Sequence, residues 1–161
     1  MPSQPKKRAW SNVSLRELVD EVAQSLAPQC KEQAVEMTLD IPSALTVFAD
    51  RELLRRAIEH LLRNALAAMP QGGSLLATSA AGFNAVELEI ADTGPTLSDE
   101  ARRCIFEPSG TAERGASAWQ LAMVRRIAEI HDGSVTAANC PEGGVALTLR
   151  IPRPAALEAA A

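Results

Sequence analysis

DRELLRRAIEHLLRNALAAM, the stretch from Asp50 to Met69, predicts a long amphipathic helix on which the rest of the fold depends. Asp50 stands where an N-cap residue is expected, and Glu52 places an acidic side chain in the first turn. The apolar residues recur at spacings of three and four, which puts them on one face against a core. They are Leu54, Ile58, Leu61, Leu62, Ala65, Leu66 and Met69.

Two polar residues, His60 and Asn64, interrupt the edge of this apolar face. They are four residues apart, so their side chains lie one turn above the other on the same side of the helix. Asparagine is a poor helix former because its amide competes for backbone hydrogen bonds. Asn64 is therefore either a solvated edge residue or a side chain whose carbonyl is turned into a cleft to hold a metal or a phosphate.

Composition bounds the class of protein. The 161 residues fit one domain; 47% are hydrophobic and only 3% aromatic, which predicts an aliphatic core. The net charge of −4, with no basic stripe among aromatic residues, gives no support for nucleic-acid binding. Cys30, Cys104 and Cys140 have no metal-ligand spacing, which favours free thiols in a reducing cytoplasm. Neither a transmembrane run nor a signal peptide is evident, so we expect no membrane contact by this piece.

The remaining patterns predict a two-layer α/β sandwich, in which a mixed, mostly antiparallel sheet carries helices on one face. We expect a flexible leader over 1–12, one domain over 13–152 and a disordered tail over 153–161. Helices are predicted from the capping box Ser14–Glu17 to near Pro28, from Ser98 through Ile105 and Phe106, and over Trp119–His131 with Gly133 as C-cap. Strands are predicted at Val35–Ile41, Leu45–Ala49, Ser74–Ala80, Ala85–Ala91, Ser134–Ala138 and Val145–Ile151, with a loop over Glu107–Ala118.

Asp92-Thr-Gly94 follows the apolar strand that ends at Ala91. An acid at that place can accept a hydrogen bond, and a glycine lets a ligand ring approach the backbone. Alone the motif is weak, because Asp and Gly are common turn residues. The order is more informative: a mid-helix Asn, then Asp-x-Gly after a strand, then a loop, then a helix that opens with small residues.

This order resembles the ATP-binding catalytic domain of sensor histidine kinases, of the superfamily that includes gyrase, heat-shock protein 90 and MutL. The likeness runs from Val13 to Pro152. Asn64, in HLLRNALAAMPQGG, matches the N-box Asn that coordinates magnesium. In IADTGP, Asp92 matches the aspartate that binds the adenine amino group, and Gly94 the glycine packed under the base. IFEP at 105–108 matches the F box, and LAMVRRIAEIHDGSV and GGVALTLRIP match the helix after the G2 box and the closing strand.

The resemblance implies a cytoplasmic domain that binds Mg-ATP and transfers the γ-phosphoryl group to a histidine on a separate dimerisation helix. His60 and Asn64 would be its catalytic residues, and Asn64 its Mg²⁺ ligand. The nucleotide would be held by Asn64, Arg63, Asp92, Gly94, Phe106, Gly115, Ser117 and Leu121. The implied partners are the dimerisation helices of the parent kinase and the receiver domain of a response regulator.

The chain departs from the family pattern at four places, one of which is the lid, where Ser109 and Gly110 follow Pro108 and Glu113 stands where a Lys is common. His60 replaces the usual asparagine one turn before the N-box Asn, and Thr96 replaces the second glycine of the G1 box. The Gly-x-Gly-x-Gly of the G2 box becomes ASAWQ at 116–120, although Gly115 stands just before it. Those glycines let backbone amides close around phosphate oxygens, and here Trp119 and Gln120 place bulk beside that turn.

Three functions remain open. The first is a working histidine kinase domain, and the second is a pseudokinase or docking module with weak or no nucleotide binding. The third, ranked lower, is an anti-sigma-type serine kinase. His60 and His131 are the only histidines. His60 lies in the expected pocket wall, and His131 at a helix end fits a capping residue. We therefore expect the acceptor helix to be absent and the chain to be a fragment.

Overall fold

A computed structural model describes residues 9–108 and 118–153, and the rest of the chain lies outside the described residues. The elements follow one another in the order β1 (Trp10–Ser14), α1 (Leu15–Gln33), β2 (Val35–Asp40), β3 (Thr46–Asp50), α2 (Arg51–Ala67), β4 (Gly73–Ala81), β5 (Ala85–Ala91), α3 (Asp99–Cys104), α4 (Ala118–Ile130), β6 (Ser134–Asn139) and β7 (Val145–Pro152). The loop predicted over Glu107–Ala118 falls largely on residues 109–117, outside this description.

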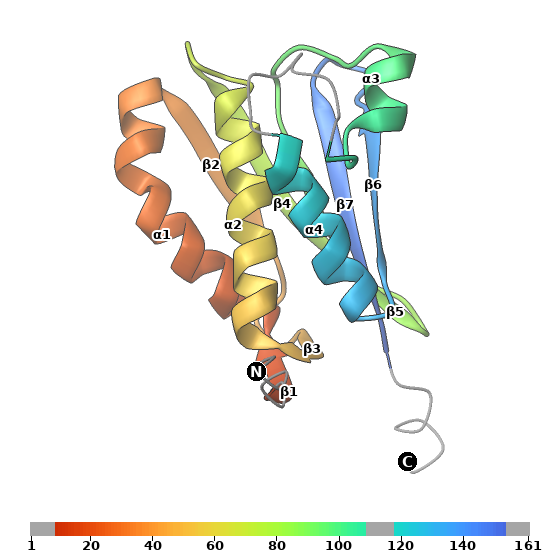
Figure 1. Ribbon diagram of the computed structural model, residues 1–161. Coiled ribbons are helices and arrows are strands. Elements are labelled where there is room, and N and C mark those ends of the chain that lie inside the picture. Colours follow the sequence, from red (N-terminus) through yellow and green to blue (C-terminus); the bar gives the residue numbers. More distant parts are fainter. Residues whose placement is uncertain (1–8, 109–117, 154–161) are drawn as a thin grey trace, which may run out of the picture.

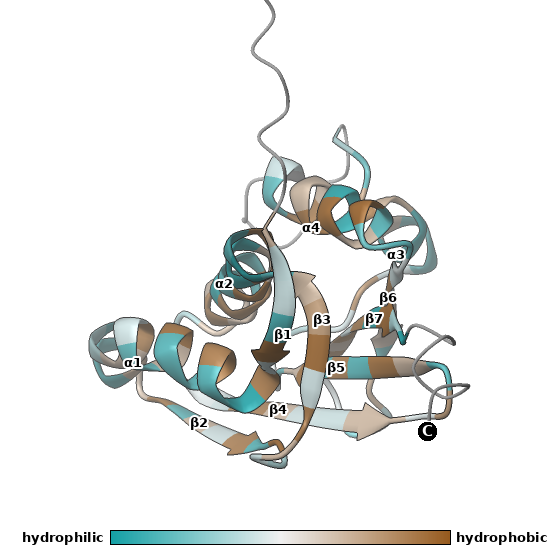
Figure 2. Ribbon diagram, turned by 90° about the horizontal axis from the view of Figure 1, so that it is seen from below, coloured by the Kyte–Doolittle hydropathy of each residue, from teal (hydrophilic) through white to brown (hydrophobic). Residues whose placement is uncertain are grey.

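The main sheet has five strands in the order β2-β4-β5-β7-β6. Strands β2 and β4 are parallel, and the other neighbours are antiparallel. Helices α1, α2 and α4 lie side by side on one face of this sheet (Figure 1), and the view from below shows the two layers (Figure 2). The predicted two-layer α/β sandwich is confirmed.

Helix α2 is the central helix of this layer, between α1 and α4 (Figure 1). Its N-cap is Asp50, whose Oδ1 accepts a hydrogen bond from the Leu53 N–H at 3.1 Å, as the sequence predicts. Its apolar face is fully covered: Leu54, Ala57, Ile58, Leu61, Leu62, Ala65 and Leu66 are each at most 2% exposed. The buried aliphatic face therefore fixes the rotation of α2, and with it the directions of His60 and Asn64.

Helix α1 begins at the predicted capping box, where Ser14 Oγ accepts a hydrogen bond from the Glu17 N–H at 3.3 Å. The prediction that it ends near Pro28 is wrong, since it continues to Gln33 and ends on Ala34, which has φ 58°. Proline removes one helical hydrogen bond. The turn that follows is held by the buried side chain of Cys30, so the helix tolerates that loss.

Strands β1 and β3 form a small antiparallel sheet of two strands, with Trp10 opposite Asp50 and Ser14 opposite Thr46. Residues 10–12 were expected in a flexible leader and belong instead to β1, which corrects that boundary. The sequence of β1 lacks the alternation of apolar and polar residues that predicts a strand, because only Val13 of this strand is buried. At the other end of the chain, the Arg153 N–H donates to the Asn84 carbonyl at 2.7 Å, and residues 154–161 are outside the described residues.

His131 is a buried structural residue, only 3% exposed. Its Nδ1 lies 2.8 Å from the Ile127 carbonyl oxygen, and its Nε2 accepts a hydrogen bond from the Asp50 N–H at 3.1 Å. The second bond requires a lone pair on Nε2, so Nδ1 carries the proton and donates to Ile127. The ring also stacks on Trp10, with centroids 4.7 Å apart. This residue therefore ties α4 to the start of α2 and to β1.

Two smaller predictions also need correction. The left-handed residue after α4 is Asp132, with φ 57°, rather than Gly133. A Cβ on Gly133 would overlap the Arg150 carbonyl oxygen, so glycine is required there for close approach to β7. Helix α3 ends at Cys104, so Ile105 and Phe106 follow it as a turn.

Candidate functional site

Asn64 is the most deeply buried polar residue that the structure describes. It is 0% exposed, and neither its Oδ1 nor its Nδ2 has a hydrogen-bond partner among the described residues. An amide buried in this way costs about 1–3 kcal/mol, because its bonds to water are lost and not replaced. The solvated-edge interpretation of Asn64 is therefore wrong, and its unsatisfied amide makes Asn64 a candidate ligand-binding residue.

His60 lies one turn before Asn64 and is half-buried, with an Nδ1 that has no partner among the described residues. Burial lowers the pKa of its imidazole; Glu59 opposes that effect, and Arg63 and Arg56 add to it. A lowered pKa keeps the ring neutral, so it can either donate or accept a hydrogen bond toward this side of α2.

Asp92 lies directly after β5 and is 4% exposed. Its Oδ1 accepts hydrogen bonds from the backbone N–H groups of Gly94 at 3.0 Å and Val145 at 3.2 Å. The Asp92 N–H in turn donates to the Val145 carbonyl at 3.0 Å, which joins the end of β5 to the start of β7. Backbone groups from two segments thus fix the orientation of the carboxylate.

Gly94 and Gly144 allow backbone segments to approach each other closely around Asp92. A Cβ on Gly94 would lie 2.6 Å from the carbonyl oxygen of Ala68, the C-cap of α2. Ala68 in turn donates its N–H to the Asn64 carbonyl at 3.2 Å, so α2 carries Asn64 to within one turn of the Asp92 loop. Gly144 has φ +91°, and a Cβ there would overlap the Asp92 carbonyl oxygen. Gly144 is not among the predicted site residues, and its only signal in the sequence is the Gly-Gly turn at 143–144.

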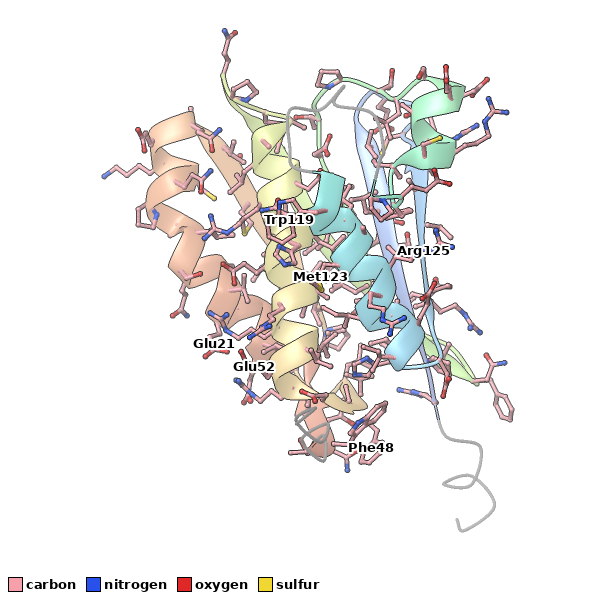
Figure 3. The ribbon with its side chains drawn as sticks, viewed as in Figure 1. Glu21, Phe48, Glu52, Trp119, Met123 and Arg125 are labelled. Atoms are coloured by element: carbon pink, nitrogen blue, oxygen red, sulfur yellow. The ribbon has the colours of Figure 1, made fainter. Side chains whose placement is uncertain are left out.

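Trp119 packs over the same side of α2 from the first turn of α4. Its ring lies edge-on to His60, with centroids 5.7 Å apart and planes at 76°. Trp119 is 56% exposed and Met123, one turn further along α4, is 39% exposed. Figure 3 shows both side chains on the side of α4 that faces α2. An aromatic residue therefore stands beside His60 at the fourth position of the segment that corresponds to the G2 box, ASAWQ at 116–120.

The other predicted site residues are distributed differently. Arg63 is on the outer surface of α2, paired with Glu59 at 3.1 Å. Leu121 is 4% exposed within the core, and Phe106 packs partly buried against that core. Gly115 and Ser117 lie outside the described residues. The end of α2 at Ala68 thus lies against Gly94, whereas Arg63 lies on the outer surface of α2 and Leu121 lies in the core.

The described residues contain neither a metal-binding cluster nor a membrane-spanning helix. No group of three or more His, Cys, Asp or Glu side chains there could hold a metal by itself. No helix among them is long and apolar enough to cross a membrane.

Comparison with known proteins shows the family. Residues 49–155 match the family described as histidine kinase-, DNA gyrase B-, and HSP90-like ATPase. The signal transduction histidine-protein kinase BaeS of Escherichia coli (strain K12) is 33% identical over 126 residues, which are 74% of this chain and 27% of BaeS. The histidine-protein kinase AtoS of the same strain is 28% identical over 152 residues, 93% of this chain and 25% of AtoS. The chain thus spans about a quarter of these relatives.

Solved structures agree with the sequence comparison. The catalytic domain of histidine kinase ThkA superposes with a TM-score of 0.80 at 25% identity, over 89% of this chain and 95% of ThkA's. Full-length ShkA in complex with AMPPNP superposes with a TM-score of 0.81 at 26% identity, over 91% of this chain and 31% of ShkA. The chain belongs to the histidine kinase-, DNA gyrase B- and HSP90-like ATPases, as a sensor histidine kinase ATP-binding domain.

Proposed function

We propose that this chain, over 13–152, binds Mg-ATP between Asn64 and Asp92 and transfers the γ-phosphoryl group to a histidine outside the chain. The observation that carries the proposal is the buried, unpartnered amide of Asn64. A ligand that satisfies this amide returns the free energy lost by its burial, so the site favours a bound state. Positioning and charge neutralisation would provide most of the catalysis, as is general in phosphoryl transfer.

The residues fit a magnesium ion that is shared with a nucleotide. Mg²⁺ prefers oxygen ligands, keeps several waters, and is usually bound through one or two protein oxygens plus substrate phosphates. Asn64 offers one such oxygen, Oδ1, and the described residues hold no acidic cluster that could bind the ion alone. When bound, magnesium would neutralise charge on the phosphates. Asn64 would fix its place, and the neutral His60 would hydrogen-bond on the same side of α2.

Asp92 is suited to bind the exocyclic amino group of adenine. A carboxylate held by the N–H groups of Gly94 and Val145 cannot rotate freely, so it offers an acceptor in a fixed direction to an exocyclic amino group. ShkA, solved in complex with the nucleotide analogue AMPPNP, has the same fold at 26% identity, which supports a nucleotide in this family.

The phosphoryl acceptor belongs to another segment. His131 is buried with both ring nitrogens engaged, and His60 lies in the proposed site itself, so neither histidine is presented to an incoming phosphate. We infer that the acceptor is carried by the dimerisation helices of a parent kinase, and that a response-regulator receiver domain then takes the phosphoryl group. ThkA has been solved in complex with the response regulator TrrA, which supports a partner of that class.

One observation favours the second candidate, a pseudokinase or docking module. Trp119 packs against His60, and Asn64 is fully shielded from solvent. A nucleotide could reach Asn64 only after these side chains move, which lowers the apparent affinity by the fraction of molecules that are open.

A titration with a fluorescent ATP analogue separates the two candidates. We expect magnesium-dependent binding to the wild-type chain, and weaker binding after Asn64→Ala or Asp92→Asn. Removal of the magnesium with a chelator should reduce the affinity of the wild type and leave that of Asn64→Ala nearly unchanged. Absence of signal at millimolar nucleotide would exclude the kinase interpretation and leave the pseudokinase.

A further inference from the structure

A groove of about 420 Å³ lies far from the proposed nucleotide site, between α1 and the edge strand β2. Its walls combine small or apolar residues with polar ones from α1. The small or apolar residues are Ala23, Ala27, Cys30, Val35, Met37 and Leu39, and the polar ones are Asp20, Gln24 and Lys31. Figure 2 shows α1 above this end of the sheet, with β2 as the outermost strand. Met37 and Leu39 are only partly buried, so apolar surface is open to a further side chain.

The outer edge of β2 offers free backbone groups beside this groove. The strand pairs only with β4 among the described residues. The Gly73 N–H donates to the Ala34 carbonyl at 3.3 Å. Backbone groups alternate in direction along a strand, so those of Glu36, Thr38 and Asp40 also face β4. The N–H and C=O groups of Val35, Met37 and Leu39 therefore point away from the sheet. Such an edge can accept another strand unless it is covered or blocked.

The opposite side of β2 is acidic. Glu36 and Asp40 are exposed, and neither has an ion pair among the described residues. Their neighbours on β4 are the uncharged Ser74 and Thr78. A second copy of this chain, added antiparallel about Thr38, would place Glu36 of each copy opposite Asp40 of the other, and like charges directly opposite are destabilising. In this register the charges disfavour self-pairing, and the exposed carboxylates favour a basic segment.

We propose that the β2 edge binds an extended partner peptide in which basic residues alternate with small apolar ones. The peptide would add a sixth strand to the main sheet through the outward groups of Val35, Met37 and Leu39. Because strand side chains alternate between faces, its apolar residues would enter the groove while its basic residues lie beside Glu36 and Asp40. This surface does not depend on the nucleotide site, so the proposal stands apart from the proposed function.

The probe is a fluorescein-labelled heptapeptide of alternating Lys and Val, tested on the full chain by fluorescence anisotropy. Two matched peptides serve as controls: alternating Glu and Val, and a block peptide with the composition of the probe. We expect the probe to bind, with amide shifts confined to β2 and α1, and both controls to bind more weakly. The double variant Glu36→Lys, Asp40→Lys should weaken the probe about tenfold and strengthen the Glu–Val peptide.

A second pair of variants tests the backbone contact. Met37→Pro removes an outward N–H without touching the bonds to β4, whereas Met37→Ala keeps that N–H and removes the same side chain. Weaker binding by the proline than by the alanine variant supports strand addition. Equal binding of the block peptide, no effect of the charge reversal, or amide shifts away from β2 would overturn the proposal. If the proline variant unfolds, the charge reversal alone decides.

Discussion

Replacing Asn64 by leucine should stabilise the nucleotide-free protein, which is the opposite of what most core substitutions do. The amide is 0% exposed and has no partner for either polar atom among the described residues. Leucine has the same branching and number of heavy atoms, and it extends the apolar face formed by Leu61 and Ala65. The substitution removes the unsatisfied groups and leaves the backbone of α2 in place.

The expected magnitude follows from three contributions. Relief of the unsatisfied amide adds about 1–3 kcal/mol to the free energy of unfolding. The higher helix propensity of leucine adds about 0.5 kcal/mol. The greater bulk of its methyl groups removes about 1 kcal/mol, at the low end of overpacking penalties. The net gain is about 0.5–2.5 kcal/mol, which raises the melting temperature of a chain this long by about 1–10 °C.

Thermal melting with and without Mg-ATP tests this reasoning. Ligand that binds only the folded state adds about 2.7 kcal/mol at a concentration of 100 Kd. Wild type should gain that stability and Asn64→Leu should not, so their order of stability reverses when nucleotide is added. Ser79→Ala is the matched control, because Ser79 Oγ is also buried without a partner among the described residues but lies on β4. It should keep the full response to nucleotide. A lower melting temperature for Asn64→Leu would refute the assignment of an orphaned amide.

The remaining predictions concern the residues around Asn64 and Asp92. Trp119→Ala should increase the affinity for Mg-ATP several-fold in a fluorescent-nucleotide titration, because it uncovers His60; unchanged affinity would show that the indole does not restrict entry. Gly144→Ala should lower the free energy of unfolding by more than about 1 kcal/mol in urea denaturation, because its φ of +91° disfavours a side chain and a Cβ would overlap the Asp92 carbonyl. Because the pKa of His60 is lowered in the folded state, the unfolded state binds a proton more readily. The contribution of the neutral His60 to stability is therefore complete above the unfolded pKa and is lost as pH falls through the folded pKa. His60→Asn should remove that acid-side loss in melts between about pH 7.5 and 5.

Much of the fold could be predicted because local signals agree with tertiary packing. The caps at Ser14 and Asp50 and the apolar periodicity of α2 give the helix starts at the observed residues. The predictions that were wrong depend on contacts between distant segments. Trp10 is fixed by β3 and His131, which no local pattern near it encodes. Position 133 requires glycine because the backbone carbonyl of Arg150, a residue far along the chain, lies where a Cβ would be.

The candidate site shows the same division. Asn64 and Asp92 could be identified because their residue types and order match a family pattern. The burial of the Asn64 amide could not, since it depends on the packing of α2 against α4 and the sheet. Nor could the contact between Trp119 and His60, because an edge-on ring pair leaves no periodic trace in a sequence. Arg63 is next to Asn64 in the N-box sequence, but its side chain lies on the outer face of α2 and pairs with Glu59. The buried apolar face of α2 fixes the rotation of the helix and so turns Arg63 outward.

The two candidate functions make different demands on α2. A docking module has no use for a fully buried amide whose hydrogen bonds are unmade, because any apolar residue at Asn64 would give a more stable helix. A kinase domain needs that amide and tolerates its cost until the ligand arrives. Trp119 does not contradict this conclusion, because it is 56% exposed and can swing away from His60 without breaking the core. The unsatisfied hydrogen bonds of Asn64 therefore favour the proposed nucleotide site over a docking module, and the Trp119→Ala titration tests whether the indole restricts entry to that site.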